Sequence, residues 1–250
     1  MTKISLKNPQ EIAICREGGR LLAKIMVELG AVLRPGIKTN AIEQLAMRLI
    51  KQNGLQSSFK GYKGYPKAVC VSVNDEVVHG IPSNRLLKRG DIVGLDLGII
   101  YQGFHLDMAK TIPLRPISAE ANHLLLTTKK SLDKALSLVK PGVFLGDISW
   151  TIQNVVESAG LAVVRDLTGH GIGRKLQEEP AIPNFGCRGE GPVLKPGMLL
   201  AIEPMVTMGS PKVKVAKDGW TVVTLDHSLS AHFEHTVAVT ATGHEVLTKL

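Results

Sequence analysis

The segment Ile92-Val93-Gly94-Leu95-Asp96-Leu97-Gly98-Ile99-Ile100 holds a single acidic residue inside an apolar run. A run of this length, rich in aliphatic and β-branched residues, is typical of a buried strand. Because side chains alternate across a strand, Asp96 shares a face with Gly94 and Gly98, whereas the leucines occupy the opposite face. Asp96 therefore lies on a face that has little side-chain bulk around it.

A later run, Met198-Leu199-Leu200-Ala201-Ile202-Glu203, has the same character and predicts a second strand that carries an acid. Short turn sequences recur in the same order and at nearly the same spacing: Pro35-Gly36 and Pro141-Gly142, Gly54-Leu55 and Gly160-Leu161, and Leu87-Lys88-Arg89-Gly90 and Leu194-Lys195-Pro196-Gly197. Because an array of repeats needs at least about three units, two copies indicate one pseudo-symmetric domain. We expect residues 1–250 to form a single domain with related halves at about 8–115 and 116–245.

Each half also contains sequences that predict helices, which would cover one face of the sheet. Asn8-Pro9-Gln10-Glu11 supplies an N-cap, a proline in the first turn and an acid at the third helical position. An apolar stripe with helical spacing follows this cap. By the same signals, the predicted helices run from Asn8 to Leu33, from Asn40 to Asn53, from Ser118 to Val139, and up to Ala159-Gly160.

Asp96 has a predicted carboxylate neighbour on the next strand. A hairpin centred on Tyr101-Gln102 places Asp96 directly opposite Asp107, unless a bulge at Gly103 shifts the register. Two facing carboxylates repel each other, and burying them without a partner is costly or forces one of them to bind a proton. No lysine or arginine on either strand is placed to neutralise both acids. A divalent cation is therefore the simplest solution.

The second half supplies equivalent acids. Glu203 aligns with Asp96 in the repeat, and His232-Phe233-Glu234 resembles His105-Leu106-Asp107. Any one of these acids by itself would be interpreted as a hydrogen-bonded core residue or a turn residue, and not as a metal ligand. Together, four acids in repeat-equivalent apolar surroundings indicate a shared metal site.

Two histidines are each open to two interpretations. His170, in Gly169-His170-Gly171-Ile172-Gly173, is either an imidazole ligand or a turn histidine, and His79, in Val77-Val78-His79-Gly80-Ile81-Pro82, is equally ambiguous. Four carboxylates and one imidazole form a hard, oxygen-rich donor set that suits a pair of Mn, Fe, Co or catalytic Zn ions. Such a pair activates water for attack on a carbonyl, so the set predicts metal-assisted hydrolysis.

Composition narrows the possible classes of protein. The chain has 250 residues, of which 44% are hydrophobic and 21% charged. It has no stretch of ~18 uncharged apolar residues and no secretory signal pattern at its start, so neither a membrane span nor secretion is expected. Its 3 cysteines are far apart in the sequence, which indicates free thiols and a cytoplasmic location. The net charge of +8 fits a solubilising surface or an anionic partner such as RNA. Because few aromatic residues are present for base stacking, sequence-specific nucleic-acid binding is not expected.

Five dispersed motifs resemble the type I methionine aminopeptidases. They run in order from about Glu11 to the C-terminus: Ser72-Val73-Asn74-Asp75-Glu76-Val77-Val78-His79-Gly80-Ile81-Pro82, the strand around Asp96 with Asp107, Thr168-Gly169-His170-Gly171-Ile172-Gly173, Ala201-Ile202-Glu203-Pro204, and Glu234-His235-Thr236. The resemblance implies an α+β pita-bread fold, in which helices cover a curved antiparallel sheet with a pseudo-twofold internal repeat. It also implies a single peptidase domain that removes N-terminal methionine from nascent proteins and peptides with a small second residue.

The resemblance assigns roles to particular residues. It implies a centre of two divalent ions, of Co, Mn, Fe or Zn, held by Asp96, Asp107, His170, Glu203 and Glu234. Glu203 would also assist proton transfer, and His79 would contact the substrate and stabilise the transition state. The methionine side chain would bind against Tyr62, Tyr65, Cys70 and Trp220.

One segment departs from the family pattern. Gln177 stands where the family has a second substrate-facing histidine, and Leu176 stands where an aromatic residue is usual in the pocket wall. Glutamine still donates a hydrogen bond to a peptide carbonyl, but it does not become cationic. We therefore expect a catalytic and substrate-binding role for Gln177, with weaker transition-state stabilisation or an altered substrate preference.

Two other functions compete with this prediction. A related pita-bread peptidase that acts on X-Pro bonds has similar ligands, but such enzymes usually carry a large additional N-terminal domain. A pita-bread adaptor without metal is a different class, and the presence of all five ligands argues against it. The expected partners are N-terminal peptides of nascent proteins and the ribosome surface, with no membrane, and the family suggests a monomer.

Overall fold

In the computed structural model, which describes residues 4–250, helices form where caps and apolar stripes predict them. The prediction that the N-terminal stretch is not a secretory signal includes residues 1–3, which lie outside the described residues. The helices are α1 (Pro9–Ala31), α2 (Thr39–Gln52), α3 (Ala119–Leu138) and α4 (Leu145–Glu157), with the short 3-10 helix η1 (Tyr62–Gly64). Among residues 4–250, none of the helices has the length and apolar character required to cross a membrane.

The start of α1 shows how local sequence determines a helix end. The Asn8 side chain accepts a hydrogen bond from the Glu11 N–H at 2.9 Å, and the Glu11 carboxylate accepts one from the Asn8 N–H at 3.0 Å. This reciprocal capping box satisfies two donors that the helix itself leaves unpaired. The Ser118 side chain caps α3 in a similar way, by accepting from the Ala121 N–H.

The strands are short, except for one long hairpin, and every pairing within the described residues is antiparallel. They are β1 (Gln56–Ser57), β2 (Val69–Val73), β3 (Glu76–Val78), β4 (Ile92–Tyr101), β5 (Phe104–Pro113), β6 (Ala162–Val163), β7 (Thr168–Gly171), β8 (Glu178–Pro183), β9 (Leu199–Ile202), β10 (Met205–Thr207), β11 (Val213–Val215), β12 (Val222–Thr224), β13 (Ser230–His232), β14 (His235–Val239) and β15 (His244–Val246).

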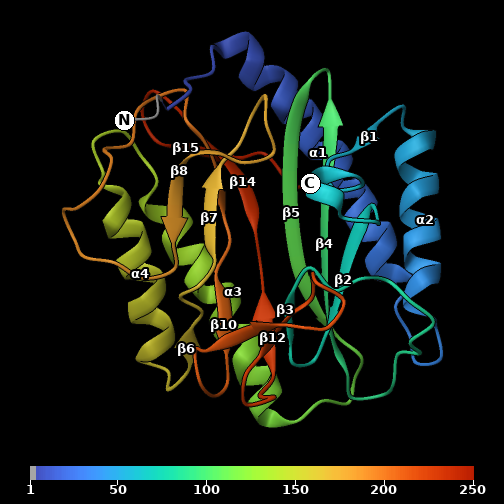
Figure 1. The fold of residues 1–250 in the computed structure, drawn as a ribbon. Coiled ribbons are helices and arrows are strands. Elements are labelled where there is room, and N and C mark those ends of the chain that lie inside the picture. Colours follow the sequence, from blue (N-terminus) through green and yellow to red (C-terminus); the bar gives the residue numbers. More distant parts are fainter. Residues whose placement is uncertain (1–3) are drawn as a thin grey trace.

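Two larger sheets meet at the centre of the molecule (Figure 1). One contains β1, β4 and β2 with β5 beside β4, and the other has the order β15-β14-β9-β7-β8. Their seam lies between β5 and β14, where the Thr236 hydroxyl accepts from the Asp107 N–H at 3.0 Å and donates to the Asp107 carbonyl at 2.8 Å. The Glu234 N–H also donates to the Ala109 carbonyl at 2.9 Å. These contacts place acids from the two halves next to each other.

Helices cover the sheets from behind in the view of Figure 1, with α1 and α2 on one side of the seam and α3 and α4 on the other. Each pair contributes to its own large apolar cluster. Leu22 and Ile25 of α1 and Ile42 of α2 pack with strands of the first half, whereas Leu124 of α3 and Ile148 of α4 pack with strands of the second. The opposite face of the sheets remains available for a site.

The hairpin of β4 and β5 corrects the predicted register. Its turn is centred on Gln102-Gly103, one residue later than expected, with φ values of 47° and 78° at these two residues. Such positive φ values are typical of the two-residue turns that match the twist of paired strands. Asp96 therefore pairs with Ala109, and Asp107 pairs with Gly98. The two acids are diagonal neighbours on one face and do not stand directly opposite each other.

The recurring turn sequences adopt matching conformations. Gly36 and Gly142 have φ values of 86° and 87°, and Gly90 and Gly197 have 94° and 91°. The Gly36 N–H donates to the Leu87 carbonyl, as the Gly142 N–H donates to the Leu194 carbonyl. These parallels support our proposal that the two halves of the single domain are related by a pseudo-twofold axis.

We expect the buried Glu43 side chain to stabilise the fold strongly, because it joins α2 to β2. Its carboxylate accepts hydrogen bonds from the Ala68 N–H at 3.0 Å and from the Val69 N–H at 3.2 Å, and the residue is 6% exposed. Glu43→Leu leaves both donors unpaired and should lower the free energy of unfolding by about 2–4 kcal/mol, measured by urea denaturation. Glu43→Gln keeps one acceptor oxygen and should cost less; equal losses for the two variants would contradict this role.

Candidate metal centre and substrate pocket

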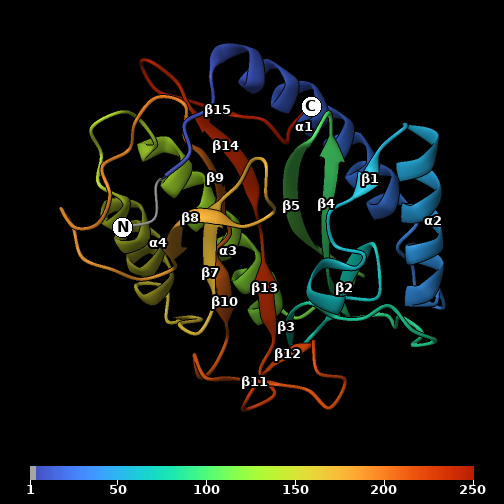
Figure 2. The same ribbon diagram turned by 45° about the horizontal axis from the view of Figure 1, so that its top comes forward.

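The predicted metal ligands come from five separate segments of the chain. Asp96 lies in the middle of β4 and Asp107 on β5, on the same face. His170 lies on β7, so it is not a turn histidine, and its role as a ligand stays a proposal. Glu203 was expected inside a strand, but it follows the end of β9. Glu234 lies between β13 and β14, two strands that follow one another in Figure 2.

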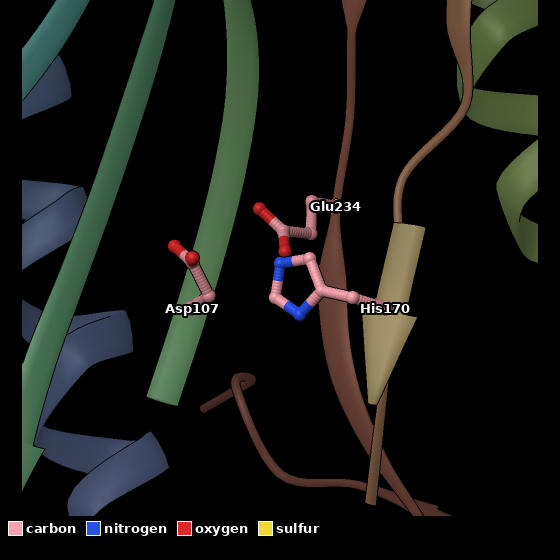
Figure 3. Close-up of side chains that lie close together, drawn as sticks. All are labelled: Asp107, His170 and Glu234. Carbon is pink, nitrogen blue, oxygen red and sulfur yellow. The ribbon is translucent and has the colours of Figure 1, made fainter. Parts of the chain in front are cut away.

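Asp107, His170 and Glu234 form the most compact part of this cluster. Each offers one ligand atom, and these atoms all lie within 4.8 Å of one another. Figure 3 shows the Asp107 carboxylate, the His170 ring and the Glu234 carboxylate around one small space. All three residues are buried, whereas Asp96 and Glu203 are half-buried at its edge.

The His170 ring is prepared to act as a ligand. Its Nδ1 donates a hydrogen bond to the Gly171 carbonyl at 2.9 Å, because a carbonyl only accepts. Nε2 therefore keeps its lone pair, and it faces Glu203 Oε1 at 3.6 Å. Burial lowers the pKa of His170, which favours the neutral imidazole that metal ions require.

The carboxyl groups carry a large electrostatic cost. Burial raises the pKa of Asp107 to about 7. The pKa values of Asp96, Glu203 and Glu234 are also raised, first by burial and then by repulsion from neighbouring acids. Without a cation, these groups must therefore share protons at neutral pH.

Unpartnered atoms show that the cluster fits a cation. Asp96 Oδ1 and Glu234 Oε1 are buried and have no hydrogen-bond partner among the described residues. Buried polar atoms are almost always paired, so each such atom requires an explanation. An oxygen-rich donor set with one imidazole nitrogen matches what Mn, Fe, Co and catalytic Zn ions prefer. The residues present therefore fit divalent metal ions.

A pocket opens above this cluster and brings together every residue that the sequence analysis singled out. Its walls include the four acids and His170 together with His79, Tyr62, Tyr65, Cys70, Leu176, Gln177 and Trp220. Tyr65 and Cys70 are buried, and the Tyr65 hydroxyl donates to the Val69 and Gly80 carbonyls. The rings of Tyr65 and Trp220 meet edge to face at 5.2 Å between centroids. This part of the wall is rigid and largely apolar.

His79 has an unusual backbone conformation at the pocket wall. Its φ of 59° lies in the left-handed region, which is uncommon for residues other than glycine and is found most often at functional sites. Its ring packs edge to face on Trp220 at 6.3 Å. Burial lowers the pKa of His79, so the ring is held as a neutral imidazole. Such a ring can donate a hydrogen bond to a substrate carbonyl.

Comparisons with known proteins agree with this geometry. The model of metallopeptidase family M24 matches residues 13–241. Methionine aminopeptidase 1 of Bacillus subtilis is 49% identical, over 99% of this chain and 100% of its own length. The Escherichia coli K12 methionine aminopeptidase is 43% identical, over 98% of this chain and 94% of its own. A crystal structure of a methionine aminopeptidase from Thermotoga maritima superposes with a TM-score of 0.98 at 46% identity, and covers 99% of this chain and 100% of that one.

The chain belongs to metallopeptidase family M24 and, within it, to the methionine aminopeptidases. The prediction from the motifs is therefore confirmed, as is the α+β pita-bread fold. A prolidase from Pyrococcus furiosus has the same fold, with a TM-score of 0.78 at 21% identity, but this chain covers only 65% of that protein. The likeness to the prolidase concerns the fold alone.

His232 is a residue of this methionine aminopeptidase that sequence reasoning missed. It is 4% exposed, and its Nε2 lies 3.3 Å from Glu203 Oε2. Burial, and then the neighbouring His79, lower the pKa of His232 to about 3, so its ring is neutral. A signal was present in the sequence, because His232 precedes Glu234 by two positions, and residues at this spacing share a face wherever the segment is extended.

Lys63 at the pocket rim was also missed. Its ammonium lies 3.2 Å from Gln177 Oε1 and 5.2 Å from the centroid of the Tyr62 ring. It follows Tyr62 directly in the sequence, but an isolated lysine in a glycine-rich turn carries no pattern that indicates a site. Its place at the pocket becomes clear only from its contact with Gln177 in the folded chain.

Proposed function

We propose that this methionine aminopeptidase removes the N-terminal methionine from nascent proteins and peptides whose second residue is small. The observation that carries the proposal is a cluster of four acids, with two buried carboxylate oxygens that have no partner, and one neutral imidazole at the base of an apolar pocket. A free N-terminal amine is cationic, and it is attracted to such an acidic base. The side chain of the first residue then lies against the apolar wall.

Five side chains hold the metal centre in this proposal, which contains two divalent ions. The ligands are Asp96, Asp107, His170, Glu203 and Glu234. Bound there, the ions would supply Lewis acidity for the scissile carbonyl and for a water molecule. His232 would lie beside this centre, with its Nε2 3.3 Å from Oε2 of Glu203.

The remaining residues bind the substrate and move protons. Tyr65, Cys70, Leu176 and Trp220 form the surface for the methionine side chain, whose flexible thioether packs well against aromatic rings. His79 donates a hydrogen bond to the oxygen on which negative charge develops. Glu203 accepts and releases a proton at its carboxylate, which lines the base of the pocket beside the other ligands.

The last part of the proposal concerns the cellular context. We propose that the enzyme acts as a monomer in the cytoplasm, on N-termini that leave the ribosome. The free thiols of Cys15, Cys70 and Cys187 are compatible with a reducing compartment. The net charge of +8 is compatible with a contact to ribosomal RNA.

Metal removal provides the direct test of the proposed function. Purified protein treated with a chelator and then dialysed should cleave a Met-Ala-Ser peptide at least about 100-fold more slowly, because its carboxylates no longer polarise a reacting group through a cation. Addition of Mn²⁺, Co²⁺, Fe²⁺ or Zn²⁺ should restore cleavage, followed by mass spectrometry, with two ions bound per chain in calorimetric titration. Preferred cleavage of an X-Pro dipeptide would contradict the proposal. A protein that cleaves no peptide, whether metal is present or removed, would also contradict it.

A further inference from the structure

The mouth of the substrate pocket is bordered by a contact between two loops. Gln177 lies in the loop between β7 and β8, and Tyr62 and Lys63 lie in η1. Gln177 Oε1 is 3.2 Å from the Tyr62 hydroxyl and 3.2 Å from the Lys63 ammonium. All three side chains line the pocket.

This contact determines which way the Gln177 carboxamide faces. A lysine ammonium has three donors and no acceptor, so the atom that approaches it is the carboxamide oxygen. The Tyr62 hydroxyl donates to the same oxygen. With Oε1 occupied from this side, Nε2 and its two N–H donors are directed away from Lys63.

The loop that carries Lys63 is held in a defined conformation. Lys63 has φ 48° and ψ 22°, in the left-handed region, between Gly61 and Gly64 with φ values of 88° and 90°. The Tyr65 N–H donates to the Tyr62 carbonyl at 2.9 Å. Because Tyr65 is buried in the pocket wall, the turn is anchored directly beside the site.

The loop that carries Gln177 is anchored on both sides of this residue. Leu176 is 5% exposed and packs in the first-half core cluster. The Glu178 carboxylate forms an ion pair with the buried Lys7 ammonium at 2.5 Å and accepts from the Lys175 N–H at 3.0 Å. Gln177 therefore extends from a fixed backbone toward a fixed turn.

We propose that Lys63 and Tyr62 are positioning residues for Gln177. They bind Oε1, and they thereby present Nε2 as a permanent, neutral hydrogen-bond donor to a carbonyl of the peptide that leaves the pocket beyond the scissile bond. Without the ammonium, the carboxamide rotates and offers either its oxygen or its nitrogen. The inference rests on the proposed function, because it requires a peptide substrate in this pocket.

Lys63→Met tests the inference, because it keeps the aliphatic stem and removes the donors. With Met-Ala-Ser as substrate, kcat/KM should fall about fivefold, as expected for one neutral hydrogen bond made only part of the time. Lys63→Arg supplies donors again and should restore most of the activity. With methionine p-nitroanilide, which has no peptide carbonyl beyond the scissile bond, Lys63→Met should change kcat/KM by less than about twofold.

A double-variant cycle separates positioning from a direct contact between Lys63 and the substrate. In a Gln177→Ala background, Lys63→Met should cause no further fall in kcat/KM. A fivefold fall in that background overturns the inference. An equal fall in kcat/KM for the two substrates in the otherwise unmodified enzyme also overturns it.

Lys60→Met is the matched control, since Lys60 is exposed in the same loop and does not line the pocket. If the unmodified enzyme does not cleave Met-Ala-Ser, the proposed function fails as well. If that enzyme is active but insensitive to Lys63→Met, only this inference fails.

Discussion

Replacing Asp107 with Asn should lower kcat/KM for Met-Ala-Ser by about 1000-fold or more, the largest effect that we expect from a single substitution, because it removes a charged metal ligand. Asp107 belongs to the compact group with His170 and Glu234, in which one ligand atom from each residue lies within 4.8 Å of the others. An asparagine side chain has the same shape but no negative charge. The variant should therefore bind divalent ions much more weakly, and calorimetric titration measures this independently of activity.

The same substitution should leave the metal-free protein at least as stable as its parent. Burial raises the pKa of Asp107 to about 7, so an ionised Asp107 is unfavourable near neutral pH in the absence of a cation. A neutral amide removes that cost, and thermal melting in the presence of a chelator measures the result. Asp133→Asn is the matched control, because Asp133 is an exposed acid on α3 that pairs with Lys129. Normal metal binding by the Asp107→Asn variant would contradict the assignment of this ligand.

Replacing His79 with Ala should lower kcat/KM by about 100- to 1000-fold, the range observed when one preorganised donor to a developing oxyanion is removed. The neutral ring of His79 is held against Trp220 at the pocket wall, and it does not belong to the compact carboxylate group. Metal binding should therefore remain unchanged in the variant. His79→Asn keeps a side-chain donor and tolerates a positive φ, so it should retain more activity than His79→Ala.

His227 supplies a closely matched control for this substitution. It has a φ of 58°, similar to the 59° of His79, and is exposed beside Asp75. His227→Ala therefore introduces the same chemical change and a similar backbone cost, outside the pocket. It should leave kcat/KM within about twofold of the parent value. A comparable loss of activity in both variants would mean that backbone strain, and not the His79 donor, accounts for the effect.

Helices and strands could be predicted well because their signals are local. The Asn8–Glu11 capping box and the Ser118 cap use atoms within three positions of each other, and β4 is apolar apart from Asp96 and its terminal tyrosine. The acids in apolar surroundings also indicated a candidate metal site, since a buried charge without a partner is unfavourable wherever the chain places it. Spacing alone could not reveal the turn centre at Gln102-Gly103, because a shift of one residue changes every cross-strand pair.

Contacts between distant segments explain what the prediction missed. His232 meets Glu203 only because β10 and β13 pair side by side, and Lys63 meets Gln177 across a separation of 114 residues. No periodic pattern connects such positions, because their approach depends on how whole sheets and loops pack.

The amino-acid sequence by itself determined the helix ends, the apolar strands, the residue types of the candidate metal site and the family. These properties depend on short-range hydrogen bonds, on side-chain alternation and on motifs that are read along the chain. Only the tertiary structure decided that Asp96 and Asp107 are diagonal neighbours, that His232 lies beside Glu203, and that Lys63 and Tyr62 contact Gln177. The physical reason is that turn geometry and the packing of separate layers set distances between residues that the sequence leaves far apart.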